Sequence, residues 1–314
     1  MTPARSCLSL RSSVAWIVGV VVLVGALLPG LPGRGVVAAG GQESAPAGGQ
    51  SIAPVYEGFW RNADGSFDLI FGYFNRRWDA EIDVPVGPDN KMEPGNLDQG
   101  QPTHFLPRRS QFLFKVRVPS NFGNKEVVWT LTTNGVTQRA FATLKPGYAV
   151  DETVLMSNFG AGGPSGYHPS LAGNKAPQLT IEGSKALTAR VGTPVVLSAV
   201  ATDDGKPAVG SIPTSRIGQS ELVPNSATGL RLSWFVYRGE GTVQFDPPQT
   251  KVWEDRRDGA DSPWSAGWKT PAVPPGNRWG ARVTFTEPGT YVLRALAHDG
   301  ALIAYDAVTV SVTP

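Results

Sequence analysis

The stretch FTEPGTYVLRALAHDGALIAYDAVTVSV, residues 285–312, decides the fold. Apolar side chains fall at every second position from 291 to 297 and again from 308 to 312, which is the period of a strand with one buried face. Between the two runs lies Asp299-Gly300, a dipeptide that adopts the positive φ of a tight turn at little cost. The pattern therefore predicts two antiparallel strands joined by a turn.

His298 stands beside Asp299 in this stretch, in a chain with only three histidines. The two side chains could be half of a catalytic site, but the strand pattern accounts for the whole stretch without one. We therefore expect His298 to lie at a strand end as a solvated neighbour of the turn. The other two histidines, His104 and His168, lie in separate regions, and no histidine has a metal-ligand spacing partner.

The rest of the chain reads as strands and turns, with no sustained helical period. Residues 54–146 contain aromatic-rich runs separated by turn signals, of which Asn134-Gly135 is the clearest. Residues 147–176 are rich in Gly and Pro and form a linker, part of which could form a short helix or pack on the first block. Residues 177–314 supply a second series of short strands. We predict an all-β protein of two antiparallel β-sandwich domains.

Three motifs of the second block occur in a recognisable order: the Asp-Asp-Gly turn at 203–205, the Trp-centred run LSWFVYRGEGTVQF at 232–245, and PGTYVLRALAHDG at 288–300. In this order they resemble the PKD-type (polycystic kidney disease) repeat, in the variant found in exported bacterial proteins and receptor-for-egg-jelly-like modules. The resemblance implies an Ig-like sandwich that serves adhesion, spacing or glycan-related binding, without catalytic residues. One departure is a long insertion at about 249–279. The first block resembles β-sandwich domains of uncharacterised exported bacterial proteins, which implies a shape and no activity.

The N-terminal segment, residues 1–39, has the features of an export signal. Arg5 and Arg11 precede an apolar run at 14–28, and Val37-Ala38-Ala39 offers a cleavage site near Ala39. The alternative is an uncleaved anchor helix, which the shortness of the run and the following prolines disfavour. Residues 40–53 then read as a flexible tether. The expected location is outside the cell or in the periplasm and envelope, with no membrane contact after cleavage.

Removal of the signal changes two compositional conclusions. The single cysteine, Cys7, is lost, so the remaining chain has neither disulfide nor thiol chemistry. Without Arg5, Arg11 and Arg34, the 28 basic side chains fall to 25, against 26 acidic ones. A nearly neutral chain lacks the basic footprint of a nucleic-acid-binding protein.

Carboxylates provide the candidate chemistry. Asp203, Asp204 and Asp299 are explained first as turn residues, and second as oxygen ligands that could gather calcium at one end of a sandwich. No other cofactor is expected. A secreted hydrolase acting on polysaccharide or peptide is the alternative function, and it would use Glu254, Asp255 or Asp258 across a cleft.

Tryptophan is the more informative residue type. Trp129 and Trp234 fall within apolar strands and are predicted to be core. The insertion at 249–279 adds four more, which either hold the loop down as a mini-core or form an aromatic platform for sugar rings or another protein. The predicted function is a non-catalytic structural or binding module of the envelope, in contact with carbohydrate or protein. Its candidate ligand-binding residues are Trp253, Trp264, Trp268, Trp279, Arg256 and Arg257.

Overall fold

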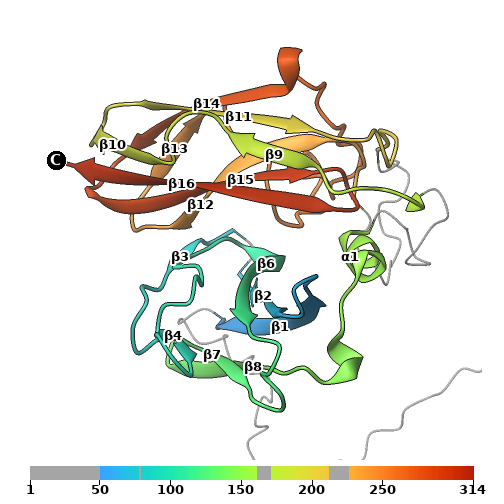
Figure 1. Ribbon diagram of the computed structural model, residues 1–314. Coiled ribbons are helices and arrows are strands. Elements are labelled where there is room, and N and C mark those ends of the chain that lie inside the picture. The colour runs from blue at the N-terminus through green and yellow to red at the C-terminus, as the bar shows by residue number, and fades with distance from the viewer. Residues whose placement is uncertain (1–49, 78, 161–170, 212–225) are drawn as a thin grey trace, which may run out of the picture. The chain divides into compact units, whose positions relative to one another are not determined.

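The computed structural model describes residues 50–77, 79–160, 171–211 and 226–314 (Figure 1). Ala45–Pro314 form one compact unit. The predicted signal, most of the predicted tether and His168 lie outside the described residues.

The first sandwich has two three-stranded sheets. One has the order β1-β2-β6, from Ile52–Arg61, Phe67–Asn75 and Arg108–Val118. The other has the order β4-β7-β8, from Asn90–Glu93, Val127–Thr133 and Val136–Ala142. Two short strands, β3 (Ile82–Asp83) and β5 (His104–Phe105), pair beside them. In immunoglobulin terms the orders are A-B-E and C-F-G, so the topology is Ig-like with strand D missing.

The predicted hairpins of this sandwich are confirmed. β1 pairs with β2, and β7 pairs with β8 around Asn134 and Gly135, whose φ values of 51° and 72° are those of a type I′ turn. From its sequence, the polar segment 88–110 would be predicted to be a long loop. That prediction is partly wrong, because the segment contributes β4 and β5. Asn90 explains why: its buried side chain accepts from Trp129 Nε1 at 3.0 Å and donates to the carbonyls of Val84 and Pro102, both at 2.8 Å.

An aromatic core joins the two sheets. Trp129 is fully buried, as predicted, and meets Phe71 and Phe114 edge-on with ring centroids 6.2 and 5.0 Å away. Phe71 and Phe114 stack on each other at 5.2 Å. Such pairs add about 1 kcal/mol each beyond the area they bury.

The predicted linker forms two short helices. The 3-10 turn η1 spans Pro146–Tyr148, and α1 spans Glu152–Phe159. Asp151 caps α1 by accepting from Val154 N at 2.9 Å, and Gly160 ends it at a φ of 83°. Phe159 packs in a small cluster with Ile70 and Phe112, so the helix lies on the first sandwich.

The second sandwich has two four-stranded sheets (Figure 1). One has the order β13-β14-β11-β9, from Val243–Asp246, Arg278–Phe285, Val195–Thr202 and Gln178–Ile181. The other has the order β10-β16-β15-β12, from Ala186–Arg190, Ile303–Thr313, Gly289–His298 and Arg231–Arg238. The 3-10 turn η5 (Pro275–Asn277) precedes β14. These orders correspond to D-E-B-A and to G-F-C, with β10 as an extra strand paired parallel to β16.

The core of this sandwich contains the residues that the alternation placed inside. Trp234 is 2 % exposed and lies between the sheets with Leu197 and Leu293. Tyr291, at the start of β15, donates its hydroxyl to the carbonyl of Glu287 at 3.0 Å, which is the tyrosine corner of Ig-like folds.

The opposite face of β12 and β15 is also covered, because Phe235, Tyr237 and Leu296 belong to the same core cluster as the first sandwich. Arg294 lies 3.4 Å from the centre of the Tyr237 ring and donates to the carbonyl of Leu113 at 2.6 Å. Arg238 binds Asp98 with N–O distances of 2.7 and 2.8 Å. The two sandwiches therefore share a core.

Among the described residues, no helix is both long enough and apolar enough to cross a membrane.

Candidate functional site

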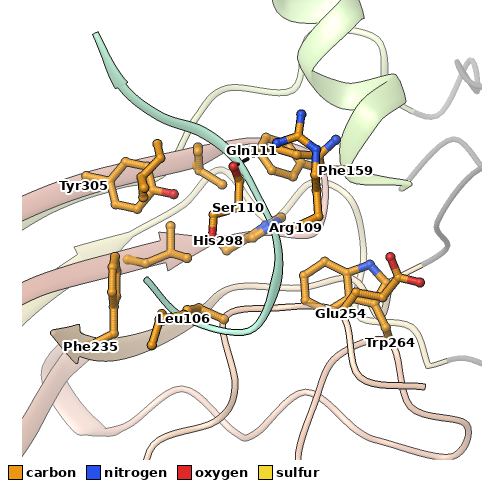
Figure 2. Close-up of a pocket in the computed structure, with 14 residues that line it drawn as sticks. Leu106, Arg109, Ser110, Gln111, Phe159, Phe235, Glu254, Trp264, His298 and Tyr305 are labelled. Atoms are coloured by element: carbon orange, nitrogen blue, oxygen red, sulfur yellow. Dashed lines mark hydrogen bonds between the residues drawn. The ribbon is translucent and has the colours of Figure 1, made fainter. Parts of the chain in front are cut away.

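A cavity of about 60 Å³ lies where β6, α1 and the insertion meet the outer face of β12, β15 and β16 (Figure 2). Its walls are mainly apolar, with rings from Phe159, Phe235 and Tyr305. The polar groups that reach it are the side chains of Arg109, Ser110, Gln111, Glu254, Trp264 and His298.

His298 is the buried polar group of this cavity, and Figure 2 shows its ring among the lining side chains. It is 5 % exposed, so the expectation of a solvated histidine is wrong. The imidazole packs edge-on against Phe159 at 4.9 Å between ring centroids. Burial, and then the charge of Arg231, lower the pKa of His298 well below its ordinary value, so the ring is neutral at neutral pH.

The hydrogen bonds of the 298–302 turn fix the tautomer of this ring. The backbone N–H of Gly300 donates to His298 Nδ1 at 2.8 Å, so Nε2 carries the proton. No hydrogen-bond partner for Nε2 occurs in the described part of the chain.

Asp299 has its own partners and does not pair with His298. Its carboxylate accepts from the backbone N–H groups of Ala301 and Leu302, at 2.5 and 2.6 Å, and from Asn174 Nδ2 at 3.0 Å. Burial raises the pKa of Asp299 to about 6 despite these bonds. The dipeptide is therefore a buried turn and not a catalytic pair.

The insertion folds around a buried carboxylate. Asp255 is 1 % exposed and accepts from Lys251 Nζ and Arg257 Nη2, both at 2.7 Å. The Arg257 guanidinium holds the pKa of Asp255 well below its usual range. Ser262 and Ser265 are buried beside it and hydrogen-bond to the carbonyls of Trp253 and Arg257 at 3.0 and 2.8 Å. These ion pairs and hydrogen bonds make the interior of the loop polar, and they hold the loop in its folded conformation.

The four tryptophans of the insertion have different partners. Trp253 packs against the core shared by the two sandwiches, and Trp264 lines the cavity. Trp268 donates to Asp261 at 2.8 Å and lies 5.9 Å from the Arg231 guanidinium. Trp279 belongs to β14, where it pairs with Ala199, so the insertion ends earlier than predicted. In the described residues, no ring contact joins two of the four.

The two predicted arginines are engaged inside the loop. Arg256 donates to Glu254 at 2.6 Å, and Arg257 donates to Asp255. Of the three carboxylates proposed for the hydrolase alternative, Glu254 and Asp255 are ion-paired and Asp258 is exposed. Asp255 is buried and has no open face toward a substrate. This arrangement lacks the pair of carboxylates facing across a cleft that glycoside hydrolysis requires.

A second concave surface, which we call the Trp253 groove, has a volume of about 510 Å³. The first sandwich contributes Glu81, Asp83 and His104, and the insertion contributes Lys251 and Trp253. His104 is 6 % exposed, with Nδ1 2.7 Å from Asp83 and Nε2 3.1 Å from Glu81. Burial alone would lower the pKa of His104, but the two carboxylates outweigh it and raise that pKa to about 9. The ring is a cation at neutral pH, with both nitrogens used as donors.

The three predicted calcium ligands lie near one end of the second sandwich. Asp203 and Asp204 accept from the backbone N–H groups of Gly205 and Lys206, at 2.9 and 3.0 Å, as turn residues. Asp203 is close enough to Asp299 for its charge to raise the pKa of that carboxyl. Asp203 Oδ1 and Asn174 Oδ1 are buried without a partner. Among the residues that the structure describes, no group of three or more His, Cys, Asp or Glu side chains could hold a metal ion.

Sequence reasoning missed Arg231 and the carboxylates around His104. Arg231 begins β12 and is the register partner of His298, and that pairing was predictable only once both strands had been aligned. Asp83 and His104 are likewise register partners across β3 and β5, which lie in segments read as one strand and one loop.

No protein-family model matches the sequence, and no curated protein matches it. Among solved structures, domains 4 and 5 of the S-layer protein SbsC align at 9 % identity and a TM-score of 0.23, over 61 % of this chain and 66 % of that chain. A chimeric titin Z1Z2, functionalised with a KLER peptide from decorin, aligns at 10 % identity and 0.24, over 84 % and 99 %. The fibronectin(III)-like modules of Clostridium thermocellum CbhA align at 8 % and 0.21, over 84 % and 94 %. At such TM-scores the neighbours carry no argument, and the Ig-like assignment rests on the strand order.

Proposed function

We propose that the protein is an exported, non-catalytic binding module of the cell envelope that holds a glycan in the Trp253 groove. The signal-like segment at 1–39 and the PKD-like motifs support the exported location and the module class. Asp255 and Glu254 are held in ion pairs, and Asp299 accepts backbone hydrogen bonds in a turn, which supports binding in preference to catalysis.

One observation carries the choice of ligand. The groove brings the half-buried ring of Trp253 alongside Lys251, Glu81 and Asp83. A sugar offers a flat C–H face that can pack on an aromatic ring, and hydroxyls that can donate to carboxylates and accept from an ammonium group. Glu81 and Asp83 converge on one imidazole, so they act as a fixed pair of acceptors and not as an opposed acid and base.

The test is retention of the full-length protein on a glycan array and on columns of envelope polysaccharide. The wild type should be retained, and Trp253→Ala should weaken retention about tenfold or more, which corresponds to about 1.4 kcal/mol. Trp268→Phe is the matched control, because Trp268 belongs to the same loop but does not line the groove. Failure of the wild type to bind any glycan, or equal binding by the Trp253 variant, would contradict the proposal. Release of shortened sugars from the array would contradict the non-catalytic assignment.

A further inference from the structure

Two buried hydrogen-bond donors without acceptors lie side by side on the outer face of the second sandwich. Arg231 and His298 are direct partners in the antiparallel pairing of β12 with β15. Directly opposite residues place their Cβ atoms about 5 Å apart on the same face of a sheet. Arg231 is 6 % exposed and His298 is 5 % exposed.

The free donor atoms are Arg231 Nη2 and His298 Nε2. The other terminal nitrogen of Arg231, Nη1, donates to the carbonyl of Ala227 at 2.8 Å. Nδ1 of His298 is taken by Gly300, as described above. A buried donor left without an acceptor destabilises the folded state, and a charged donor does so more than a neutral one. The fold should therefore supply an acceptor at this point.

The positive charge of Arg231 is not neutralised by a contact. Burial lowers the pKa of Arg231 to about 10, which leaves it charged at neutral pH. In the part of the chain that the structure describes, no carboxylate lies within ion-pair distance of it. The charge of Asp299 acts on Arg231 and favours its charged form. The Asp299 oxygens, however, accept hydrogen bonds from Ala301, Leu302 and Asn174.

Space for an acceptor exists at this position. A small cavity of about 10 Å³ is lined by both Arg231 and His298, and it shares His298 and Trp264 with the cavity of about 60 Å³ in Figure 2. The other cations of these cavities are already matched: Lys251 by Asp255 and Arg109 by Glu57, with N–O distances of 2.7 and 2.6 Å. The combined space suits one small ion or a few waters, and excludes an organic ligand.

We propose that a small monovalent anion of halide size binds between Arg231 and His298. The anion accepts from Arg231 Nη2 and His298 Nε2–H and neutralises the buried guanidinium, which water cannot do. Val252, Pro263 and Trp264 of the insertion close the same cavity, so the anion joins the loop to β12 and β15. This site borders the Trp253 groove, with which it shares Thr250, Lys251 and Val252. Its two donors, Arg231 and His298, lie outside that groove, so either proposal can fail without the other.

Bromide is the probe for the direct test. Crystals of the full-length protein grown in sodium bromide should give an anomalous peak within hydrogen-bond distance of Arg231 Nη2 and His298 Nε2. Ordinary water density at that position, without anomalous signal, would overturn the proposal.

A solution test uses melting temperature at constant ionic strength, with sodium chloride exchanged for sodium gluconate, whose anion is too large for the cavity. Because an anion that binds only the folded state stabilises it, chloride should raise the midpoint by a few degrees. Arg231→Met should abolish this increment, whereas Arg282→Met, on the exposed surface of β14, should retain it.

If Arg231→Met does not fold, His298→Phe replaces it, since that variant keeps a ring of similar size but loses the Nε2–H donor. In this variant, the rise in melting temperature caused by chloride should be less than half of the rise in the wild type. An equal increment in His298→Phe and the wild type, or no chloride effect in the wild type, would exclude the anion.

Discussion

Asp255 is a carboxylate whose surroundings define its role. A buried acid with two cationic partners is a structural anchor when its oxygens are saturated, and a catalytic candidate when one of them faces open space. Lys251 and Arg257 saturate it, and the same loop buries the hydroxyls of Ser262 and Ser265. The residue first considered for hydrolysis thus organises the insertion.

Asp255→Asn should destabilise the folded protein at pH 7 by about 2 kcal/mol, because two partly exposed cations lose their shared carboxylate. The folded pKa of Asp255 is lowered, so its contribution is present above the ordinary carboxyl pKa and is lost as the pH falls below about 4. Chemical denaturation at pH 7 and pH 3 measures the difference in unfolding free energy between the wild type and Asp255→Asn. This difference should be smaller at pH 3 than at pH 7. Asp258→Asn, at an exposed position nearby, should change stability by less than about 0.5 kcal/mol. Equal losses of unfolding free energy in the two variants would contradict the anchoring role of Asp255.

The contribution of His104 to the unfolding free energy should have the opposite pH dependence. Its pKa is raised from 6.5 to about 9 in the folded state, so its contribution is fully present below pH 6.5 and is lost as the pH rises toward 9. The wild type should lose about 3 kcal/mol of unfolding free energy across this range. His104→Gln should be less stable at pH 6 and show a flatter profile. A wild-type profile that is flat between pH 6.5 and 9 would show that the imidazole is not held as a cation.

At the scale of elements, the bend at 203–205 approaches the turn at 299–302, and both present acidic side chains. Burial, and to a lesser extent the charge of Asp203, raises the pKa of Asp299. Burial, followed by the charge of Asp204, raises the pKa of Asp203. Asp203 Oδ1 and Asn174 Oδ1 have no partner. Calcium at this end would bind Asp203 Oδ1 and Asn174 Oδ1, because a hard cation prefers carboxylate and amide oxygens. Water would have to complete its coordination, since the described residues hold no group of three acidic or histidine side chains that could bind a metal ion.

Calcium should therefore raise the melting temperature of protein that has first been treated with a chelator. Asp203→Asn should reduce this shift, while Asp246→Asn, an exposed acidic residue of β13, should leave it unchanged. Differential scanning calorimetry with millimolar calcium and with EDTA measures both. If the melting midpoint of the wild type is the same with calcium and with EDTA, the prediction of calcium binding at this end of the sandwich is wrong.

At the scale of the whole molecule, the shared core predicts that the two sandwiches unfold as one cooperative unit. Tyr237, Arg294 and Leu113 connect the two sandwiches through ring contact and hydrogen bonding. Arg294→Ala should lower the midpoint by an amount equivalent to about 2 kcal/mol, whereas Arg282→Ala, on the exposed side of the other sheet, should have little effect. Calorimetry tests this, and two separate transitions in the wild type would contradict it.

The same core explains what could be predicted from the sequence. Alternation in 291–297 assigned the inward face of β15 correctly, because burial between two sheets imposes a period of two. It could not show that the other face is covered as well, since the first sandwich that covers it is remote in sequence. His298 was therefore expected in solvent and is buried. Likewise, a Pro- and Gly-rich loop gives no periodic signal, so the partners of its tryptophans could not be assigned from sequence.

The parallel pairing of β10 with β16 has a mechanical consequence. Residues 186–190 run in the same direction as residues 309–313 and are bonded to them in register. Tension applied between the start of β10 and the end of β16 pulls these strands along each other, so their hydrogen bonds are loaded together and not one after another. A hairpin such as β15–β16 would instead open from one end, bond by bond. The second sandwich is thus built to resist stretching along its strands.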